Sequence, residues 1–394
     1  MSDTIVISSA CRTPLGMAPL GNLSDVSAVD LLTAVFKETL KRSKLDPRHI
    51  SEVIAGNVAQ SSDAPNIARV AALKAGVPKQ VPGFTVQRNC GSGLQALVSA
   101  AQAVKAYDAD MVLVGGTESM SNIPHILRGL RKGLKYDPRK MLANFVDGLG
   151  EGLIDPITGE VMGKTAENIA ATYAVSRADQ DEFAADSHRK AFRAMREGKF
   201  RPQIVAIQTR KELVAQDEGI NAGLNKETLA LFPTIFQEKG TVTPGNSCPL
   251  SDGASSFLVT TLAIAKRYSL NPEAEILSYA FAGCDPSYMG MGPVWAIPNA
   301  LLESRISVRD IDLFEINEAF AAQVLACQRG LQIPIEKLNV WGGAIALGHP
   351  VGATGAILTT KAIAMLKDLK KELAVVSMCI GGGQGGALVL RNLN

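Results

Sequence analysis

The chain has 394 residues, of which 46% are hydrophobic and 20% are charged. That length and composition allow two or three domains with buried cores and exclude an intrinsically disordered chain. The net charge of +2 excludes a strong overall attraction to nucleic acid or to anionic membranes.

Cysteine usage and the N-terminal segment predict where the protein works. The six cysteines are scattered, with no paired CxxC spacing, which fits a reducing compartment and argues against a zinc site or a disulfide framework. The first residues lack a basic segment followed by an apolar core, and no run of about 18 apolar residues occurs. We therefore expect a cytoplasmic protein without a signal peptide, a membrane span or a bound metal.

Strands and helices alternate over the first 120 residues. Apolar runs predict the strands, and apolar residues at helical spacing predict the helices. In chain order we expect strand Thr4–Ser8, helix Val26–Leu40 capped by Ser24 or Asp25, strand Ile50–Asn57, helix Asn66–Ala75, strand Phe84–Gln87, a helix from near Gly91 to Tyr107, and strand Met111–Gly116. This alternation indicates an α/β layered fold with a largely parallel sheet.

Cys90 lies in GFTVQRNCGSGLQALVSA (83–100), at the junction between a predicted strand and a predicted helix. The free N–H groups and positive dipole end of that helix favour a thiolate, and Gly91 and Gly93 leave the sulfur accessible. Two interpretations stand at this point. Cys90 is either a nucleophile or an ordinary buried cysteine.

The character of the chain changes at about Ser121. Arg128–Lys140 holds six basic residues and one acidic residue, and Thr165–Arg196 predicts one or two amphipathic helices. The basic stretch is either a solvated loop or a segment for subunit assembly and attraction of phosphates. Because β character resumes at about Ser256–Thr261, we expect three units: 1–121 plus 243–270, an inserted loop (cap) domain 122–242, and 271–394.

The second half of the chain repeats the pattern of the first. SKLDPRHISEVIAGN (43–57) aligns with SRISVRDIDLFEINE (304–318) at an offset of 261, which also places Gly91 on Gly352. MVLVGGTES (111–119) matches VVSMCIGGG (375–383) at a slightly larger offset. The sequence therefore predicts a duplicated α/β unit, in which strand ends of both halves meet at a shared interface suited to ligands.

Three further residues lie at predicted strand ends or loops of that interface. Asn317 ends an apolar strand, His349 lies in a glycine-rich loop, and Cys379 follows a buried apolar run. Taken singly, each has an ordinary structural explanation: a turn asparagine, a loop-packing histidine and a core cysteine. The other histidines, at 49, 125 and 188, occupy polar stretches that predict surface positions.

Gly381–Gly383 follows the predicted strand that carries Cys379. A phosphate-binding loop requires a helix after the glycines, whereas Ala387–Leu390 predicts another strand, so backbone N–H groups for an oxyanion are the better interpretation. A thiolate with a histidine base forms an acyl-enzyme, and a second cysteine moves a proton at the carbon beside a thioester. Together the residues fit making or breaking a carbon–carbon bond next to a thioester.

With these motifs in view, the sequence resembles the thiolases along nearly its whole length. The matching stretches include NCGSGLQA, VGGTESMS, GTVTPGNS, INEAFAAQ, GGAIALGHPVGATG and CIGGGQG. The resemblance implies the duplicated five-layer αβαβα thiolase fold with an inserted loop domain. It also implies a homodimer or homotetramer, acyl-CoA and CoA as ligands, and no resident cofactor.

The resemblance assigns a role to each candidate catalytic residue. Cys90 is the acylated nucleophile, His349 activates it, Cys379 is the acid and base at the α-carbon, and Asn317 holds a catalytic water. The N–H groups of Cys90 and Gly381 form one oxyanion hole, and His349 with the Asn317 water forms the other.

CoA contacts follow from the same comparison. They are Met162, Thr228, Phe236, Pro244, Ser247, Cys248, Met289, Ala319 and Phe320. Three positions depart from the short-chain pattern: Val161 stands where a histidine is frequent, Cys248 where a serine touches CoA, and Asn221 where an arginine is frequent. We expect Val161 to widen the acyl site and to favour a broad-range 3-ketoacyl-CoA thiolase over a strict acetoacetyl-CoA enzyme.

Two rival functions remain to be weighed. A decarboxylating ketoacyl synthase would carry a second histidine in place of Asn317, and a non-catalytic acyl-CoA-binding scaffold would lack one of Cys90, His349 or Cys379. The sequence meets neither requirement. It leaves open the physiological direction and the need for a partner enzyme of β-oxidation, and it predicts no nucleic-acid partner.

Overall fold

A mixed sheet runs through the computed structural model, which describes residues 4–133 and 138–394. Within those residues ten strands pair into one sheet, in the order β12-β13-β14-β11-β1-β10-β5-β3-β4, with β2 also pairing with β10. The strands are β1 (Ile5–Arg12), β2 (Gly16–Met17), β3 (Glu52–Gly56), β4 (Gly83–Val86), β5 (Met111–Ser119), β10 (Ser251–Thr261), β11 (Pro272–Gly283), β12 (Leu313–Ile316), β13 (Leu373–Ile380) and β14 (Gln384–Asn392).

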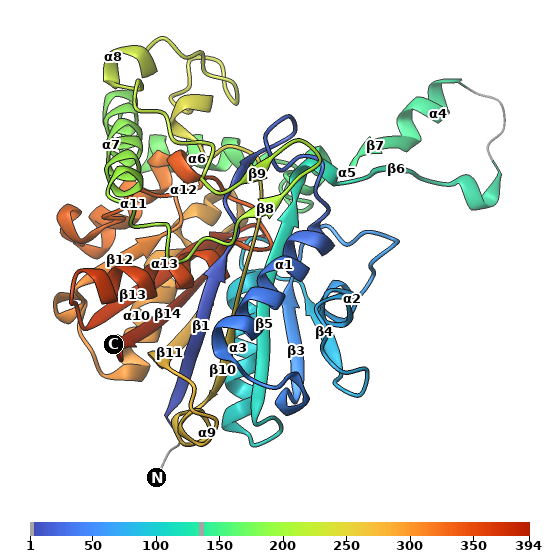
Figure 1. Cartoon of the computed structure of the whole chain (residues 1–394). Coiled ribbons are helices and arrows are strands. Elements are labelled where there is room, and N and C mark those ends of the chain that lie inside the picture. The colour runs from blue at the N-terminus through green and yellow to red at the C-terminus, as the bar shows by residue number, and fades with distance from the viewer. Residues whose placement is uncertain (1–3, 134–137) are drawn as a thin grey trace.

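Helices cover the two outer faces of the sheet, and a further layer of helices lies between its two halves (Figure 1). On one outer face, α1 (Ala28–Ser43) and α2 (Ile67–Lys74) pack on the strands of the first half. On the other, α10 (Gly292–Ser304) and α11 (Ala321–Leu331) pack on the second half. Between them, α3 (Ser92–Lys105) and α13 (Thr354–Asp368) lie against each other in the largest apolar core. This arrangement confirms the predicted duplicated five-layer αβαβα fold.

The prediction of a largely parallel sheet is wrong. Only β3–β4, β3–β5 and β12–β13 pair in parallel, while the other pairs are antiparallel. Parallel pairs require a crossover helix, and the chain supplies one only within each repeated βα unit. After the insertion β10 returns antiparallel between β1 and β5, and β14 follows β13 through a tight glycine turn.

Helix starts show how side chains fix the local structure. α1 begins at Ala28 with Ser27 as its cap, not Ser24 or Asp25 as predicted. Those two side chains are used elsewhere: the Ser24 hydroxyl donates to the carbonyl of Gly21, and the Asp25 carboxylate accepts from the N–H of Arg210. α2 follows Asn66, whose side chain accepts from the N–H of Arg69 and so satisfies one free donor of the first turn.

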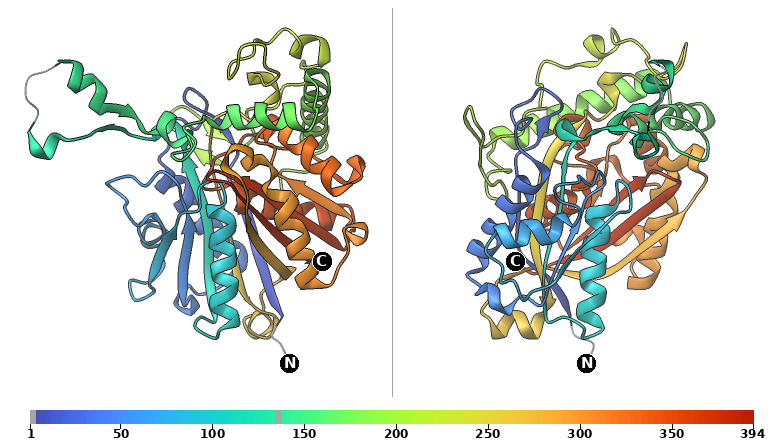
Figure 2. Two further views of the ribbon diagram at one scale, coloured as in Figure 1. Left: turned by 180° about the vertical axis from the view of Figure 1, so that it is seen from behind. Right: turned by 90° about the vertical axis from the view of Figure 1, so that its right-hand side faces the viewer.

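The segment between β5 and β10 leaves the sheet and forms an arm and a helical region. The arm holds β6 (His125–Leu127), a short 3-10 turn at Leu130–Lys132, α4 (Pro138–Asn144), β7 (Phe145–Asp147) and α5 (Gly148–Gly152). It projects from the body in Figure 1 and in the left view of Figure 2. The predicted helical stretch is two helices, α6 (Met162–Thr172) and α7 (Arg177–Arg196). β8 (Ile207–Gln208), β9 (Leu213–Val214) and α8 (Lys226–Leu229) complete it. The three proposed unit boundaries stay a prediction.

Two sequence-based expectations concern membrane-spanning helices and the exposure of the histidines. In the described part of the chain, no helix has the length and apolar character needed to cross a membrane. His49 and His125 are exposed as predicted, but His188 is buried, so that prediction is wrong. His188 shares a buried face of α7 with Ala184 and Ala191, and its Nδ1 accepts a hydrogen bond from the N–H of Asn221.

Candidate active site

Cys90 lies at the tight turn between β4 and α3, as the sequence predicts. Asn89 before it has a φ of 43°, and Gly91 after it occupies the cap position of α3. A Cβ at position 91 would lie 2.5 Å from Cδ1 of Ile380 in β13, so any larger residue there would require the Ile380 side chain to move. The turn therefore brings Cys90 to the interface of the two halves.

Burial, rather than the helix end, dominates the ionisation of Cys90. Desolvation raises the pKa of the Cys90 thiol to about 11, and hydrogen bonding from the N–H groups of Gly381 and Cys90 itself opposes this only in part. The helix end was expected to favour the thiolate, but burial outweighs it and raises the pKa of the thiol. The same N–H groups are the pair that the sequence predicts for an oxyanion hole, and the structure places both at the sulfur.

His349 follows α12 (Ala344–Leu347) and is 5% exposed. Its Nδ1 lies 2.6 Å from the hydroxyl of Thr354, and that hydroxyl donates to the carbonyl of Pro350 at 2.9 Å. Thr354 can then only accept from His349, which places the ring proton on Nδ1 and leaves Nε2 as the basic nitrogen. Burial lowers the pKa of His349 to about 4, so the imidazole is neutral and able to act as a base.

Cys379 and Asn317 occupy neighbouring strand ends. Cys379 is 2% exposed near the end of β13, and burial together with the nearby Cys90 raises its thiol pKa well above the ordinary value. The N–H of Asn317, directly after β12, donates to the carbonyl of Ser377 in β13 at 2.9 Å. The Asn317 side chain is fully buried, and neither its oxygen nor its nitrogen has a partner among the described residues. A buried amide without partners fits the predicted role of holding a water.

Five of the predicted CoA contacts surround Cys379. They form one apolar cluster, whose members include Met162, Phe236, Met289, Ala319 and Phe320. The rings of Phe236 and Phe320 pack edge to face with centroids 6.1 Å apart. Two more contacts join the same cluster through the backbone: Ser247 pairs with Phe320, and the N–H of Cys248 donates to the carbonyl of Ala319.

Two predicted CoA contacts, Pro244 and Thr228, lie outside this cluster: Pro244 is exposed at the start of the 3-10 turn Pro244–Asn246. Thr228 is exposed on α8, and its hydroxyl is used in a capping box with Asn225. Asn221 is likewise exposed and supplies no charge where an arginine is frequent. Val161 pairs with Ile154 across a narrow hairpin.

Models of known families match almost the whole chain. The model described as "Thiolase, N-terminal domain" covers residues 5–263, and "Thiolase, C-terminal domain" covers residues 270–392. The chain belongs to the thiolase family. The predicted relationship is thus confirmed.

Similar proteins agree with this assignment along their full length. A probable acetyl-CoA acyltransferase of Staphylococcus epidermidis is 43% identical over 391 residues, 98% of each chain, and one of Staphylococcus aureus is 42% identical over the same share. The crystal structure of Bacillus anthracis acetyl-CoA acetyltransferase superposes with a TM-score of 0.95 at 40% identity, covering 100% of this chain and 99% of that one. Human mitochondrial 3-ketoacyl-CoA thiolase, solved also in complex with CoA, gives 0.95 at 39%, with at least 98% of each chain covered.

Two residues of this thiolase that the sequence analysis missed support the site. Thr354 orients His349, and its position five residues later in the same motif was the available signal. Glu118, buried at the end of β5, accepts from the N–H groups of Val58, Ala59 and Gly352 and from the Asn57 amide. It therefore ties the first half of the thiolase fold to the loop that carries His349. Burial raises the pKa of Glu118 to about 7.

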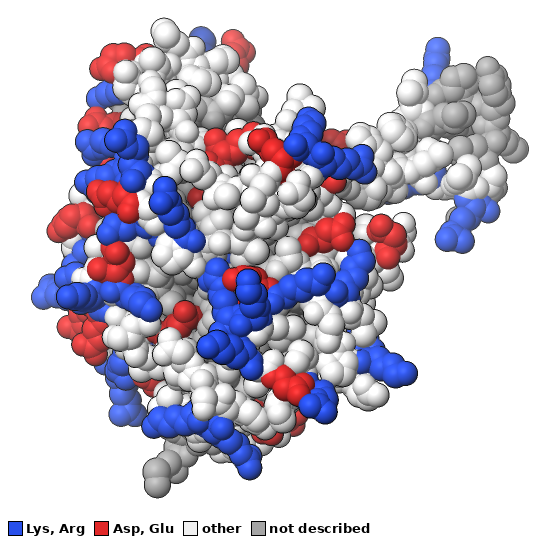
Figure 3. All heavy atoms as spheres, in the orientation of Figure 1, with Lys and Arg blue, Asp and Glu red and all other residues white. Residues whose placement is uncertain are grey.

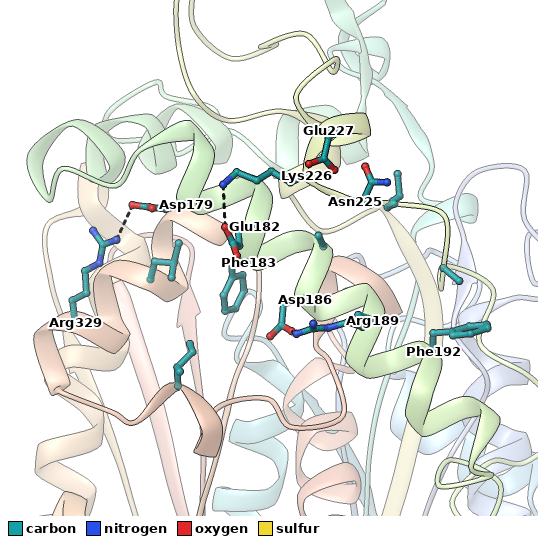
Figure 4. Close-up of a pocket in the computed structure, with 15 residues that line it drawn as sticks. Asp179, Glu182, Phe183, Asp186, Arg189, Phe192, Asn225, Lys226, Glu227 and Arg329 are labelled. Carbon is teal, nitrogen blue, oxygen red and sulfur yellow. Dashed lines mark hydrogen bonds and ion pairs between the residues drawn. The ribbon is translucent and has the colours of Figure 1, made fainter.

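Two cavities differ in their relation to this site. A cavity of about 470 Å³ is lined by Cys90, Gly381 and Met162 together with mostly apolar side chains. A larger one, of about 920 Å³, lies between α7, α11 and the segment before α8, and contains none of the predicted site residues (Figure 4). Several of its charges are paired with each other, for example Asp179 with Arg329 and Glu182 with Lys226. The smaller cavity is therefore the candidate substrate cavity.

Proposed function

We propose that this thiolase is an acyl-CoA C-acyltransferase that cleaves 3-ketoacyl-CoA with CoA, or condenses two acetyl-CoA molecules in reverse, through an acyl-Cys90 intermediate. The observation that carries this is the meeting of Cys90 with the N–H of Gly381 beside an apolar cavity. The names of the relatives, acetyl-CoA acyltransferase and 3-ketoacyl-CoA thiolase, support it. A scaffold protein would not need Cys90, His349 and Cys379 together.

Cleavage begins with proton transfer from the Cys90 thiol to Nε2 of His349. Because the pKa of Cys90 is about 11 and that of His349 is about 4, this transfer is unfavourable in the free protein. The proton transfer therefore occurs together with attack of the sulfur on the C3 carbonyl. The N–H groups of Cys90 and Gly381 stabilise the negative charge that develops on the carbonyl oxygen.

The second half of the cycle uses Cys379 and Asn317. The C2–C3 bond breaks, its electron pair stays on the acetyl-CoA fragment as an enolate, and that carbon takes the proton of the Cys379 thiol. A water held by Asn317, with His349, stabilises the enolate oxygen. Acetyl-CoA leaves, and free CoA then gives its thiol proton to Cys379 and attacks the Cys90 thioester. The shortened acyl-CoA is released, and the leaving Cys90 thiolate takes back the proton held on Nε2 of His349. The cycle requires no cofactor or metal besides the CoA thioesters.

The cavity beside Cys90 supports acyl chains longer than acetoacetyl. Its 470 Å³ lies within the range of small-molecule sites, and each methylene buried there contributes about 0.8 kcal/mol. The basis differs from the sequence argument, since the described residues that line the cavity include Ile154 but not its partner Val161. We propose a broad-range 3-ketoacyl-CoA thiolase, with a strict acetoacetyl-CoA enzyme as the alternative.

Steady-state thiolysis over a series of chain lengths tests both the activity and its range. We expect kcat/KM for 3-oxooctanoyl-CoA to equal or exceed that for acetoacetyl-CoA. A fall of more than tenfold from the four-carbon to the eight-carbon substrate would select the strict short-chain alternative. Absence of thiolysis at every length would refute the proposed activity.

We propose that the arm and strand β4 are assembly surfaces of a homodimer or homotetramer. The arm exposes Ile126, Leu130, Leu142 and Phe145 by 41–76%, so an isolated arm would leave an apolar surface in water; basic and uncharged side chains share its described part in Figure 3. β4 is an edge strand with unpaired backbone groups. Leu134, part of the predicted apolar set, lies outside the described residues.

Light scattering tests this assembly with a deletion that the structure defines. Ile126 pairs with Val146, so residues 126–146 can be replaced by two glycines while His125 and Asp147 stay neighbours. We expect a tetramer to become a dimer. A monomer of the full chain at micromolar concentration would refute assembly, and an unchanged dimer would remove the role of the arm. A cytoplasmic place in fatty acid β-oxidation, with or without a partner enzyme, is our further proposal.

A further inference from the structure

The cavity beside Cys90 has walls that are mostly apolar. Its apolar lining comes from three parts of the chain: the loop after β3, the two ends of the arm, and the loop after His349. Representative side chains are Val58, Met120, Ile123, Leu149, Leu153 and Val351. Such a wall stabilises a hydrocarbon tail by removing it from water.

The charged side chains in this wall are both acidic. Among the described residues that line the cavity, Glu151 and Asp155 carry carboxylates, and no lysine, arginine or histidine is present. Glu151 is half exposed, and both of its oxygens lie 2.5 Å from the guanidinium of Arg128. The Arg128 guanidinium is thereby already matched by a carboxylate.

Asp155 differs from Glu151 because it is buried and only partly satisfied. It is 1% exposed, and its Oδ1 accepts from the N–H groups of Ile157 and Thr158 at 2.9 and 3.0 Å. Its Oδ2 is buried without a partner among the described residues. Asp155 therefore gives the wall a carboxylate oxygen for which the described residues supply no hydrogen-bond or ion-pair partner.

From this arrangement we propose that the cavity accepts uncharged acyl tails and rejects tails that end in a carboxylate, with Asp155 as the specificity-determining residue. The inference rests on the proposed thiolase function and narrows its substrate class. A terminal carboxylate in the cavity would lose its hydration, would meet no positive partner and would be repelled by Asp155. A methyl-terminated tail of the same length has none of these costs.

Matched substrates separate the effect of charge from that of length. We compare thiolysis of 3-oxooctanoyl-CoA with that of 3-oxo-octanedioyl-CoA, which has the same chain and a terminal carboxylate. We expect kcat/KM to be about 100-fold lower for the dicarboxylic substrate, in keeping with the penalty for an unpaired buried charge. Equal efficiencies would overturn the inference.

A variant pair isolates the contribution of Asp155. Asp155→Asn keeps an oxygen for the two backbone donors but removes the charge. We expect the ratio of kcat/KM for 3-oxooctanoyl-CoA to kcat/KM for the dicarboxylic substrate to fall about tenfold in this variant. Asp147→Asn is the control, since Asp147 caps α5 nearby but does not line the cavity. The ratio is taken within each variant, so partial loss of folded protein cancels. An unchanged ratio in Asp155→Asn would remove the assigned role of Asp155.

The outcomes distinguish this inference from the proposed function. Thiolysis of 3-oxooctanoyl-CoA with equal thiolysis of the dicarboxylic substrate overturns the inference alone. Thiolysis of acetoacetyl-CoA with both eight-carbon substrates inert overturns the proposed chain length and this inference with it. Inactivity on all three substrates overturns the proposed function itself.

Discussion

Replacing Thr354 by valine tests how His349 is kept in its active tautomer. Valine keeps the branched shape of threonine but cannot accept the Nδ1–H of His349, which now lies 2.6 Å from the Thr354 hydroxyl. The carbonyl of Pro350, which that hydroxyl also contacts, keeps the N–H groups of Ala353 and Thr354 as donors. The change therefore removes two hydrogen bonds of the Thr354 hydroxyl, of which only the one to His349 orients the imidazole.

The expected loss follows from the cost of an unpaired buried donor. That cost is about 1–3 kcal/mol, and at about 1.4 kcal/mol per tenfold it corresponds to a loss of about 5- to 150-fold in the population of the tautomer with a free Nε2. We expect kcat for acetoacetyl-CoA thiolysis and the single-turnover rate of Cys90 acetylation to fall together by that factor. Absorbance of the enolate form and intact mass spectrometry measure the two rates.

The matched control is Thr354→Ser, which keeps the hydroxyl. It should restore most of the rate, while a purely structural role of the Thr354 methyl would leave serine and valine variants equally impaired. The thermal midpoint of both variants is measured alongside. If Thr354→Val turned over within twofold of the unsubstituted enzyme, the assigned tautomer would be wrong.

Other predictions address the remaining site residues. Cys90→Ser should not accumulate an acetyl-enzyme, whereas Cys379→Ser should acylate and then fail at carbon–carbon chemistry; an acetyl group on Cys379 with Cys90 unmodified would reverse the roles. Asn317→Leu should unfold at the same or a higher temperature, because it removes an unpartnered buried amide, yet lose at least about 100-fold in activity; a stable variant with full activity would end the water-holding role. Since the pKa of His349 is lowered to about 4, the acid limb of kcat/KM should lie near that value, and a limb near 6.5 would contradict it. Because the pKa of buried His188 is also lowered to about 4, the unfolded chain binds more protons between pH 6.5 and 4, so the thermal midpoint should fall across that window and fall less in His188→Gln.

Pattern and spacing were sufficient for the layers of the fold but not for strand direction. The repeat of 43–57 at 304–318 predicted the duplication because each copy carries its own apolar periodicity. The direction of β10 was not encoded locally, since it depends on where the chain returns after the long insertion. A periodicity argument contains no information about that return path.

The site shows a similar division between residues and their environment. Cys90 and Asn317 follow strands whose ends could be read from the sequence, Cys379 lies near the end of a third strand, and His349 lies in a glycine-rich loop. The ionisation of Cys90 could not be read in this way, because a helix end favours the thiolate while burial by residues from the other half favours the thiol. His188 was missed because its polar neighbours in sequence do not face the same side of α7 as its buried neighbours in space.

The position of the arm decides what a chimera of two thiolases would exchange. Its outgoing strand starts just after Ile123 and its returning strand ends just before Leu149, and both of these side chains line the acyl cavity. Beside these strands, Gly148 lies so close to Pro124 that a Cβ would be 2.5 Å from the Pro124 carbonyl oxygen. A graft cut at 122 and 153 would thus transplant part of the acyl cavity together with the arm, whereas a graft cut inside the His125–Asp147 pair would move the arm alone. In chimeras of related thiolases, we expect a cut at 122 and 153 to transfer chain-length range and quaternary structure together. We expect a cut inside the His125–Asp147 pair to transfer quaternary structure alone.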